Sequence, residues 1–208
     1  MKNIFITAFL AASALLVSSC SGDDDVAAPA GPQAVETVTV SNFFANQTGG
    51  QGGASGGSFA KFSFSQNAAV TGDDWDIAFR GTTLLINGGD KIGIDDEPAR
   101  TGTGAASIVT GTYNSVTQVP ATAVFTQDGP DTYAIPIGSD NGWYIYDSTN
   151  HLITPKAGRI LLIKTHDGKY AKMEILSYYQ NAPANPTIDS PSRYFTFKFA
   201  YQPDGTTF

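Results

Sequence analysis

Apolar and polar residues alternate along most of this chain with a period of two, the spacing of a β-strand. In WDIAFR (residues 75–80), this alternation predicts a strand that buries Trp75, Ile77 and Phe79, while Asp76 and Arg80 face outward. The 22 glycines and 11 prolines interrupt such runs, and no stretch has a convincing helical spacing. The chain is therefore predicted to be all-β, with mostly antiparallel sheet.

Similar alternating runs predict the remaining strands. They lie at residues 37–44, 59–65, 107–112, 132–137, 142–146, 159–164, 170–178 and 194–201. Between the first two runs, residues 48–57 are so rich in glycine that we expect a mobile hairpin loop there.

The clearest local prediction is a hairpin over residues 159–176. Asp167-Gly168 favours the positive φ angles of a type I′ turn, so the flanking runs are expected to pair as antiparallel strands. In the second strand, Ala171, Met173 and Ile175 share one face. Met173 is therefore explained as a core residue.

The only cysteine, Cys20, follows the small residues Ser18 and Ser19 at the end of an apolar run from Ile4 to Val17. That run has the length of a signal-peptide core and is too short to cross a bilayer. The pattern predicts a bacterial lipoprotein signal at residues 1–19, whose removal leaves Cys20 carrying the lipid.

Asp23, Asp24 and Asp25 come just after the predicted lipid attachment site. Such acidic runs resemble the surface-export signals of some Gram-negative lipoproteins, so we expect an outer-membrane protein exposed at the cell surface. Residues 20–37 are predicted to be the lipidated cysteine with a flexible linker, and residues 38–208 a single all-β domain.

The charge and the cysteine content exclude several functions. A net charge of −7 without basic stripes argues against nucleic acid as a partner. With no cysteine besides Cys20, the predicted domain has no disulfide, thiolate metal site or cysteine nucleophile. The acidic group at residues 90–97 is expected to be a solvated loop, because its spacing fits no calcium-binding loop.

Four segments follow one another along the chain: WDIAFR (75–80), GWYIYD (142–147), DGKYAKM (167–173) and YFTFKFAY (194–201). Together, in this order, they resemble the HmuY-like family of haem-binding lipoproteins. The resemblance spans roughly residues 38–201, and it implies an all-β surface lipoprotein. It also implies capture of haem for iron acquisition and transfer to a TonB-dependent outer-membrane receptor, without catalysis.

Haem capture needs axial ligands to the iron, usually neutral imidazole or thioether. In haem-binding relatives one ligand falls in the segment that corresponds to residues 127–133, where this chain has neither His nor Met. The second falls in the connection at residues 147–155, which makes His151 the best single candidate. His166 and Met173 are weaker iron-ligand candidates, and Tyr146 is predicted to contact the cofactor.

These residues also have plainer explanations. His166 suits an exposed hairpin turn, and His151 suits a loop in which it bonds to nearby backbone. Tyr144, Tyr146, Tyr178 and Tyr179 either line a flat ligand or are half-buried strand aromatics. A competing hypothesis follows from the missing first ligand: an accessory lipoprotein on the same scaffold that binds a glycan, a peptide or a receptor without haem.

No set of residues supports an enzyme. The string Gly-Ala-Ser-Gly-Gly at residues 53–57 matches G-x-S-x-G, but a nucleophile elbow needs a strand before it and a helix after it. Here the surroundings are glycine-rich loop. The chain is therefore predicted to bind a ligand rather than transform one.

Overall fold

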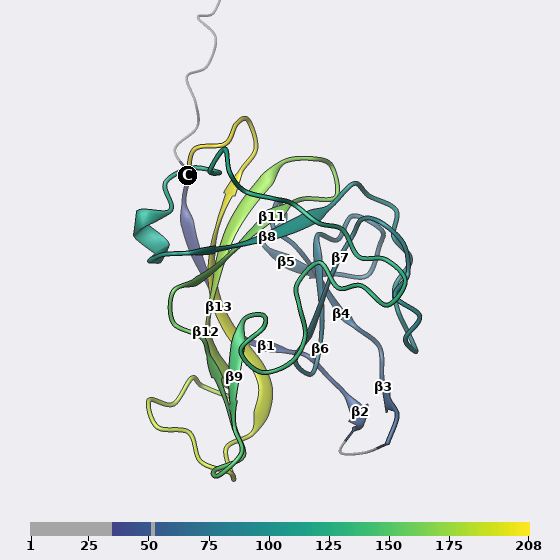
Figure 1. Cartoon of the computed structure of the whole chain (residues 1–208), viewed down its shortest axis with the longest axis vertical. Helices are drawn as coiled ribbons and strands as arrows, with labels where there is room; N and C mark the ends of the chain where they lie inside the picture. The colour runs from purple at the N-terminus through teal and green to yellow at the C-terminus, as the bar shows by residue number, and fades with distance from the viewer. Residues whose placement is uncertain (1–34, 51–52) are drawn as a thin grey trace, which may run out of the picture. The chain divides into compact units, whose positions relative to one another are not determined.

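The computed structural model describes residues 35–50 and 53–208 (Figure 1). The predicted signal peptide (residues 1–19), Cys20 and most of the predicted linker lie outside the described residues. The first strand begins at Thr37, next to the predicted domain start at residue 38. Within the described ranges, no helix combines the length and the hydropathy that a membrane span requires.

The larger sheet has five antiparallel strands in the order β1-β13-β12-β11-β8. Its strands are β1 (Thr37–Phe44), β8 (Ala105–Thr110), β11 (Arg159–Lys164), β12 (Tyr170–Tyr179) and β13 (Ser192–Gln202). The two longest, β12 and β13, lie side by side at the middle of the sheet (Figure 1). Their length explains why this part of the sequence has the most regular alternation.

A second antiparallel sheet has the order β5-β4-β6-β7. It is formed by β4 (Ala60–Ser63), β5 (Ala68–Val70), β6 (Ile77–Arg80) and β7 (Thr83–Ile86). Two further strand pairs and one short 3₁₀ helix complete the described part: β2 (Thr48–Gly49) with β3 (Ser55–Gly56), β9 (Tyr144–Asp147) with β10 (Leu152–Pro155), and η1 (Tyr113–Ser115). The all-β prediction is confirmed.

The main hydrophobic core lies between these two sheets. Phe62 and Phe79 of the smaller sheet contact Phe197 of β13 with ring centroids 5.3 and 5.7 Å apart. All three side chains are at most 1% exposed. Because aromatic side chains bury large apolar areas, alternate residues of β13 anchor the two sheets to each other.

The prediction that Asp76 and Arg80 face solvent is wrong, because both are buried, at 1% and 3% exposure. Strand β6 lies inside its sheet, and a second apolar cluster that includes Trp75, Ala78 and Leu85 covers its other face. Trp75 therefore packs in a different cluster from Ile77. Alternation identifies the two faces of a strand, but it does not say whether the second face is covered.

The predicted hairpin forms, with Leu161 opposite Met173, but its turn is not type I′. Within the turn, Gly168 has a positive φ of 86° and Asp167 does not, and the Gly168 N–H donates to the carbonyl of Thr165 at 3.0 Å. This is a three-residue loop in which a left-handed glycine follows a β-turn. Met173 is fully buried in the main core, as expected for a core residue.

Two other expectations need correction. Residues 132–137 form no strand, and only an isolated bridge joins Thr132 to Gly129. The residues after Asp147, expected to be a connection, include strand β10 and make a hairpin with β9. The glycine-rich segment does form a hairpin, since β2 pairs with β3.

The acidic segment at residues 90–97 is not wholly solvated. Asp90, Asp95 and Asp96 are exposed, but Glu97 is 9% exposed and accepts hydrogen bonds from the backbone N–H groups of residues 92, 93 and 94. A buried carboxylate with several donors is a structural anchor of its loop.

Candidate functional site

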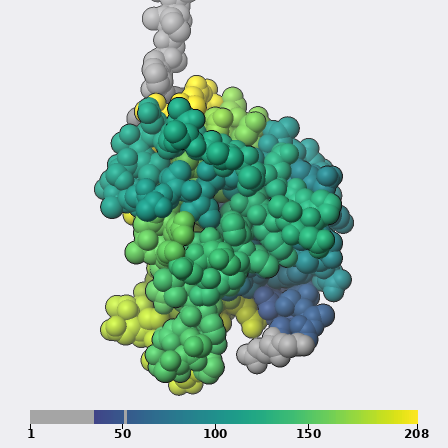
Figure 2. Space-filling model, viewed as in Figure 1, coloured from purple at the N-terminus to yellow at the C-terminus, as the bar shows by residue number. Residues whose placement is uncertain are grey.

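A cleft of about 720 Å³ lies between the β9–β10 hairpin and the loop that joins β12 to β13. This volume is typical of a small-molecule site. Figure 2 shows both segments at the surface at the same end of the described part. The lining residues are Gln47, Thr82, Tyr146, His151, Leu152, Ile153, Tyr178, Tyr179, Thr187, Ile188, Ser190, Ser192 and Arg193.

His151 and Tyr146 form a bonded pair on the hairpin wall of the cleft. The Tyr146 hydroxyl lies 2.7 Å from Nδ1 of His151, and both side chains are exposed. If Nδ1 carries the proton and donates to the tyrosine oxygen, the lone pair of Nε2 is free to bind a metal. The pair that the sequence proposed for the cofactor therefore lines one cleft.

Local structure determines where His151 points. One carboxylate oxygen of Asp147 accepts the backbone N–H groups of Thr149 and Asn150, at 2.8 and 3.3 Å. Together with the bond to the Asn150 side chain, these contacts lower the pKa of Asp147 and hold the loop tight. His151 follows with a φ of 56°, a left-handed conformation that is uncommon for a residue with a β-carbon.

The hairpin is tied to the two sheets by aromatic residues. The backbone N–H of Ile153 donates to the Tyr179 hydroxyl at 2.9 Å, and Nε1 of Trp143 donates to the carbonyl of Thr82 at 3.0 Å. Trp143 also packs against Phe195 of β13, with ring centroids 5.1 Å apart. The hairpin that carries His151 is therefore attached to both sheets by hydrogen bonds and aromatic packing.

Tyr178, Tyr179 and Arg193 line the side of the cleft formed by the larger sheet. Tyr178 is 5% exposed, and burial raises the pKa of its hydroxyl, so it stays protonated at neutral pH. Arg193 donates from Nη1 to the carbonyl of Gln47 at 2.7 Å. Of the four tyrosines proposed from sequence, Tyr146, Tyr178 and Tyr179 line the cleft, and Tyr144 does not.

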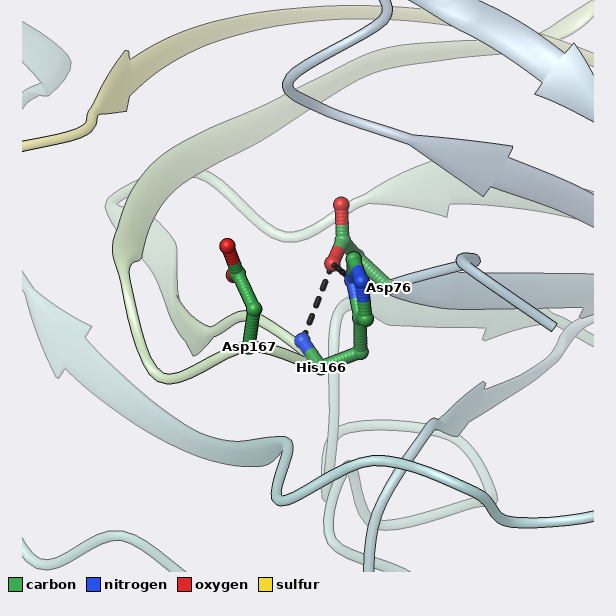
Figure 3. Close-up of side chains that lie close together, drawn as sticks. All are labelled: Asp76, His166 and Asp167. Atoms are coloured by element: carbon green, nitrogen blue, oxygen red, sulfur yellow. Dashed lines mark hydrogen bonds and ion pairs between the residues drawn. The ribbon is translucent and has the colours of Figure 1, made fainter.

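His166 does not line the cleft. Its Nδ1 lies 2.7 Å from Oδ1 of the buried Asp76, and its backbone N–H donates to the same oxygen at 3.0 Å (Figure 3). With Asp167, these residues form the one group of three potential metal-ligating side chains in the part of the chain that the structure describes. Hydrogen bonds explain the His166–Asp76 contact, so we assign it a structural role.

Met173 is also remote from the cleft lining and is fully buried in the core. Of the three iron-ligand candidates, the structure brings only His151 to the cleft.

Sequence analysis missed Arg193 and Gln47. Arg193 is the second residue of a long strand, and Gln47 lies between two strands, so neither belongs to a recognisable motif. They meet through long-range pairing of β1 with β13, and a single sequence carries no local signal of such a contact.

A family model described as HmuY protein matches residues 57–198. No curated protein matches the chain. The matched range includes Tyr146, His151 and Arg193, so most of the cleft lies within it.

Several solved structures are similar to the chain at low sequence identity. A chain described as a lipoprotein, from Bacteroides fragilis NCTC 9343, is 14% identical, with a TM-score of 0.48 over 81% of this chain and 89% of that one. A chain from Bacteroides vulgatus ATCC 8482, described as HmuY-like and heme binding, is 11% identical, with a TM-score of 0.47 over 82% and 93%. The apo HmuY analog of Tannerella forsythia is 11% identical, with a TM-score of 0.49 over 82% and 97%.

Proposed function

Because the chain belongs to the HmuY family, we propose that it is a lipid-anchored outer-membrane protein that binds haem for iron acquisition. The family resemblance implies haem as the ligand. The observation that carries the proposal for this chain is the His151–Tyr146 pair in the cleft between the β9–β10 hairpin and the β12–β13 loop. The chain retains its ligand and does not transform it.

The residues present fit haem bound through one protein ligand. His151 supplies the imidazole, and in the tautomer whose Nδ1–H donates to Tyr146, Nε2 can coordinate iron. Tyr178, Tyr179 and Ile188 supply flat or apolar surface for a porphyrin. Within the described residues, the cleft lining has no second His and no Met, so the proposed site takes iron from one side only.

Haemin titration of the full-length chain in detergent tests this proposal. We expect a saturable shift of the Soret band with the unchanged chain, and a loss of at least about tenfold in affinity for His151→Ala, since the only imidazole at the cleft is removed. Tyr146→Phe keeps the imidazole but removes its partner, so its effect should be smaller than that of His151→Ala.

His166→Ala is the matched control, because it removes the other histidine at a place outside the cleft lining. Its Soret shift should equal that of the unchanged chain. An unchanged spectrum with micromolar haem would reject haem as the ligand. A shift that survives His151→Ala but is lost in His166→Ala or Met173→Ala would keep the function and overturn the assigned ligand.

A second candidate function is supported by the cleft lining, which offers His151 as its one iron-ligand candidate among the described residues. The cleft lining carries the hydroxyls of Thr187, Ser190 and Ser192 besides its tyrosines, a surface that suits a glycan or a peptide without iron. Under this alternative the chain is an accessory binding lipoprotein for such a ligand or for an outer-membrane receptor. Binding of a glycan array or of peptides, with no Soret shift, would favour it.

The proposed anchor is the lipid on Cys20, and the proposed partner for haem transfer is a TonB-dependent receptor of the outer membrane. Cys20→Ser should abolish the incorporation of labelled fatty acid into the chain, because the thioether to diacylglycerol cannot form. Protease added to intact cells should degrade the unchanged chain if it is exposed at the surface. Equal labelling of both chains would contradict the lipid anchor.

A further inference from the structure

Arg193 gives the cleft a positive charge that no lining carboxylate balances. Among the described residues that line the cleft, none is Asp or Glu, and Arg193 is the only Arg or Lys. Within residues 35–50 and 53–208, Arg193 forms no ion pair. A cation without a balancing negative charge in a concave site favours an anionic ligand.

The backbone holds Arg193 rigidly beside the cleft. Its φ is 70°, in the left-handed region, and its carbonyl accepts the N–H of Ala45 at 2.8 Å. Such conformations in residues other than glycine concentrate at binding sites, where the surrounding structure holds them. His151, on the hairpin wall of the same cleft, shares this feature, with a φ of 56°.

The Arg193 guanidinium has more N–H donors than its hydrogen bond to Gln47 uses. It has five N–H groups, and Nη1 is used for the carbonyl of Gln47 at 2.7 Å. The Tyr178 hydroxyl is a further neighbour and stays neutral. The remaining donors lie in the planar fork that matches a carboxylate with two parallel hydrogen bonds.

We infer that Arg193 binds a carboxylate of the ligand and that the cleft selects flat aromatic carboxylic acids over their neutral esters. The inference rests on the proposed function, because the propionate groups of haem are the carboxylates concerned. It adds a specificity-determining residue that does not touch the iron. It also separates haem from a neutral glycan, which would gain nothing from the charge.

Metal-free protoporphyrin IX and its dimethyl ester test the inference without iron chemistry. Quenching of the tryptophan fluorescence of the full-length chain reports binding. We expect the acid to bind at least about tenfold more tightly than the ester, the effect of losing a hydrogen bond to a charged group. Arg193→Gln should remove most of this preference, and Arg193→Lys should keep part of it.

Lys91→Gln is the matched control, because it removes the same charge from an exposed loop residue that does not line the cleft. Its preference for the acid should be unchanged. Circular dichroism checks that each variant folds; if Arg193→Gln does not fold, the acid-to-ester ratios of the unchanged chain and of Arg193→Lys still decide the question.

The two proposals fail in different ways. A Soret shift with haemin together with equal affinity for acid and ester overturns the role of Arg193 and leaves haem binding in place. Tighter binding of the acid without any Soret shift supports Arg193 and rejects iron coordination. A preference for the acid that persists in Arg193→Gln overturns the assignment of the residue.

Discussion

Asp76 is a fully buried carboxylate that joins the two sheets. It precedes β6 of the smaller sheet, where its Oδ2 accepts the N–H of Phe64 at 2.7 Å. Its Oδ1 accepts the backbone N–H of His166, in the turn between β11 and β12 of the larger sheet, and lies 2.7 Å from Nδ1 of the same residue. Since buried carboxylates are stable only when their oxygens are bonded, this residue needs the complete tertiary structure around it.

Asp76→Asn should lower the free energy of unfolding by about 3 kcal/mol, because an amide NH₂ replaces one acceptor and the bonds lose their charge assistance. Urea denaturation measures this loss. Asp131→Asn is the control, because Asp131 is exposed and has a φ of 54° that asparagine also adopts. The free energy of unfolding of this variant should change little. Equal stability of Asp76→Asn and the unchanged chain would contradict the role of Asp76.

At the level of elements, the β11–β12 hairpin depends on the backbone of one turn residue. Gly168 has a φ of 86°, and a β-carbon there would meet only side-chain atoms at 3.8 and 3.9 Å, which are ordinary contacts. The obstacle to another residue is therefore the left-handed conformation and not a lack of space.

Gly168→Ala should cost about 1–2 kcal/mol of unfolding free energy, the penalty for placing a β-carbon in the left-handed region. Thermal denaturation detects a change of this size. Gly129→Ala is a suitable control, because Gly129 lacks a positive φ and has open space around its α-carbon. If Gly129→Ala lost as much unfolding free energy as Gly168→Ala, the effect would not come from the φ angle.

At the scale of the whole described part, a buried charge network connects distant loops. Nη2 of Arg100 lies 3.0 Å from carboxylate oxygens of both Glu97 and Asp128. Asp128 also accepts the backbone N–H groups of Ile86 and Ala134, each at 2.9 Å. This network ties the acidic segment to β7 and to the region after Asp128.

The two carboxylates of this network respond to pH in opposite directions. Burial alone raises the pKa of Glu97, but the three backbone N–H donors and Arg100 outweigh it, so the pKa is lowered. For Asp128, burial outweighs its donors and Arg100, so the pKa is raised. Glu97 therefore stabilises the fold above its unfolded pKa, and this contribution is lost as pH falls through its folded pKa.

Glu97→Gln should destabilise the fold by about 3 kcal/mol at pH 7, because it breaks a buried ion pair. The difference from the unchanged chain should shrink once the pH falls below about 4, near the unfolded pKa of glutamate. Urea denaturation at a series of pH values measures this trend.

Asp128→Asn provides the opposite case. Because native Asp128 holds its proton more tightly than the unfolded chain does, the stability of the unchanged chain relative to this variant should fall as pH rises above about 4. For each variant, the difference in unfolding free energy from the unchanged chain is plotted against pH. Parallel plots for Glu97→Gln and Asp128→Asn would contradict the two opposite pKa directions.

The amino-acid sequence was enough to predict the all-β class, the strands at residues 37–44 and 159–164, and the pairing of β11 with β12. These features depend on local alternation and on turn residues, which each segment carries within itself. It also singled out Tyr146 and His151, which are close in sequence and bond to each other in the structure.

Long-range packing sets which second faces are covered and which residues meet at the cleft, and no local pattern predicts it. Asp76 and Arg80 are buried because another cluster packs on β6, and Arg193 reaches the cleft because β13 pairs with β1. The alternation of a strand records its two faces but not what packs on them, and the contacts that form the cleft join residues far apart in the chain.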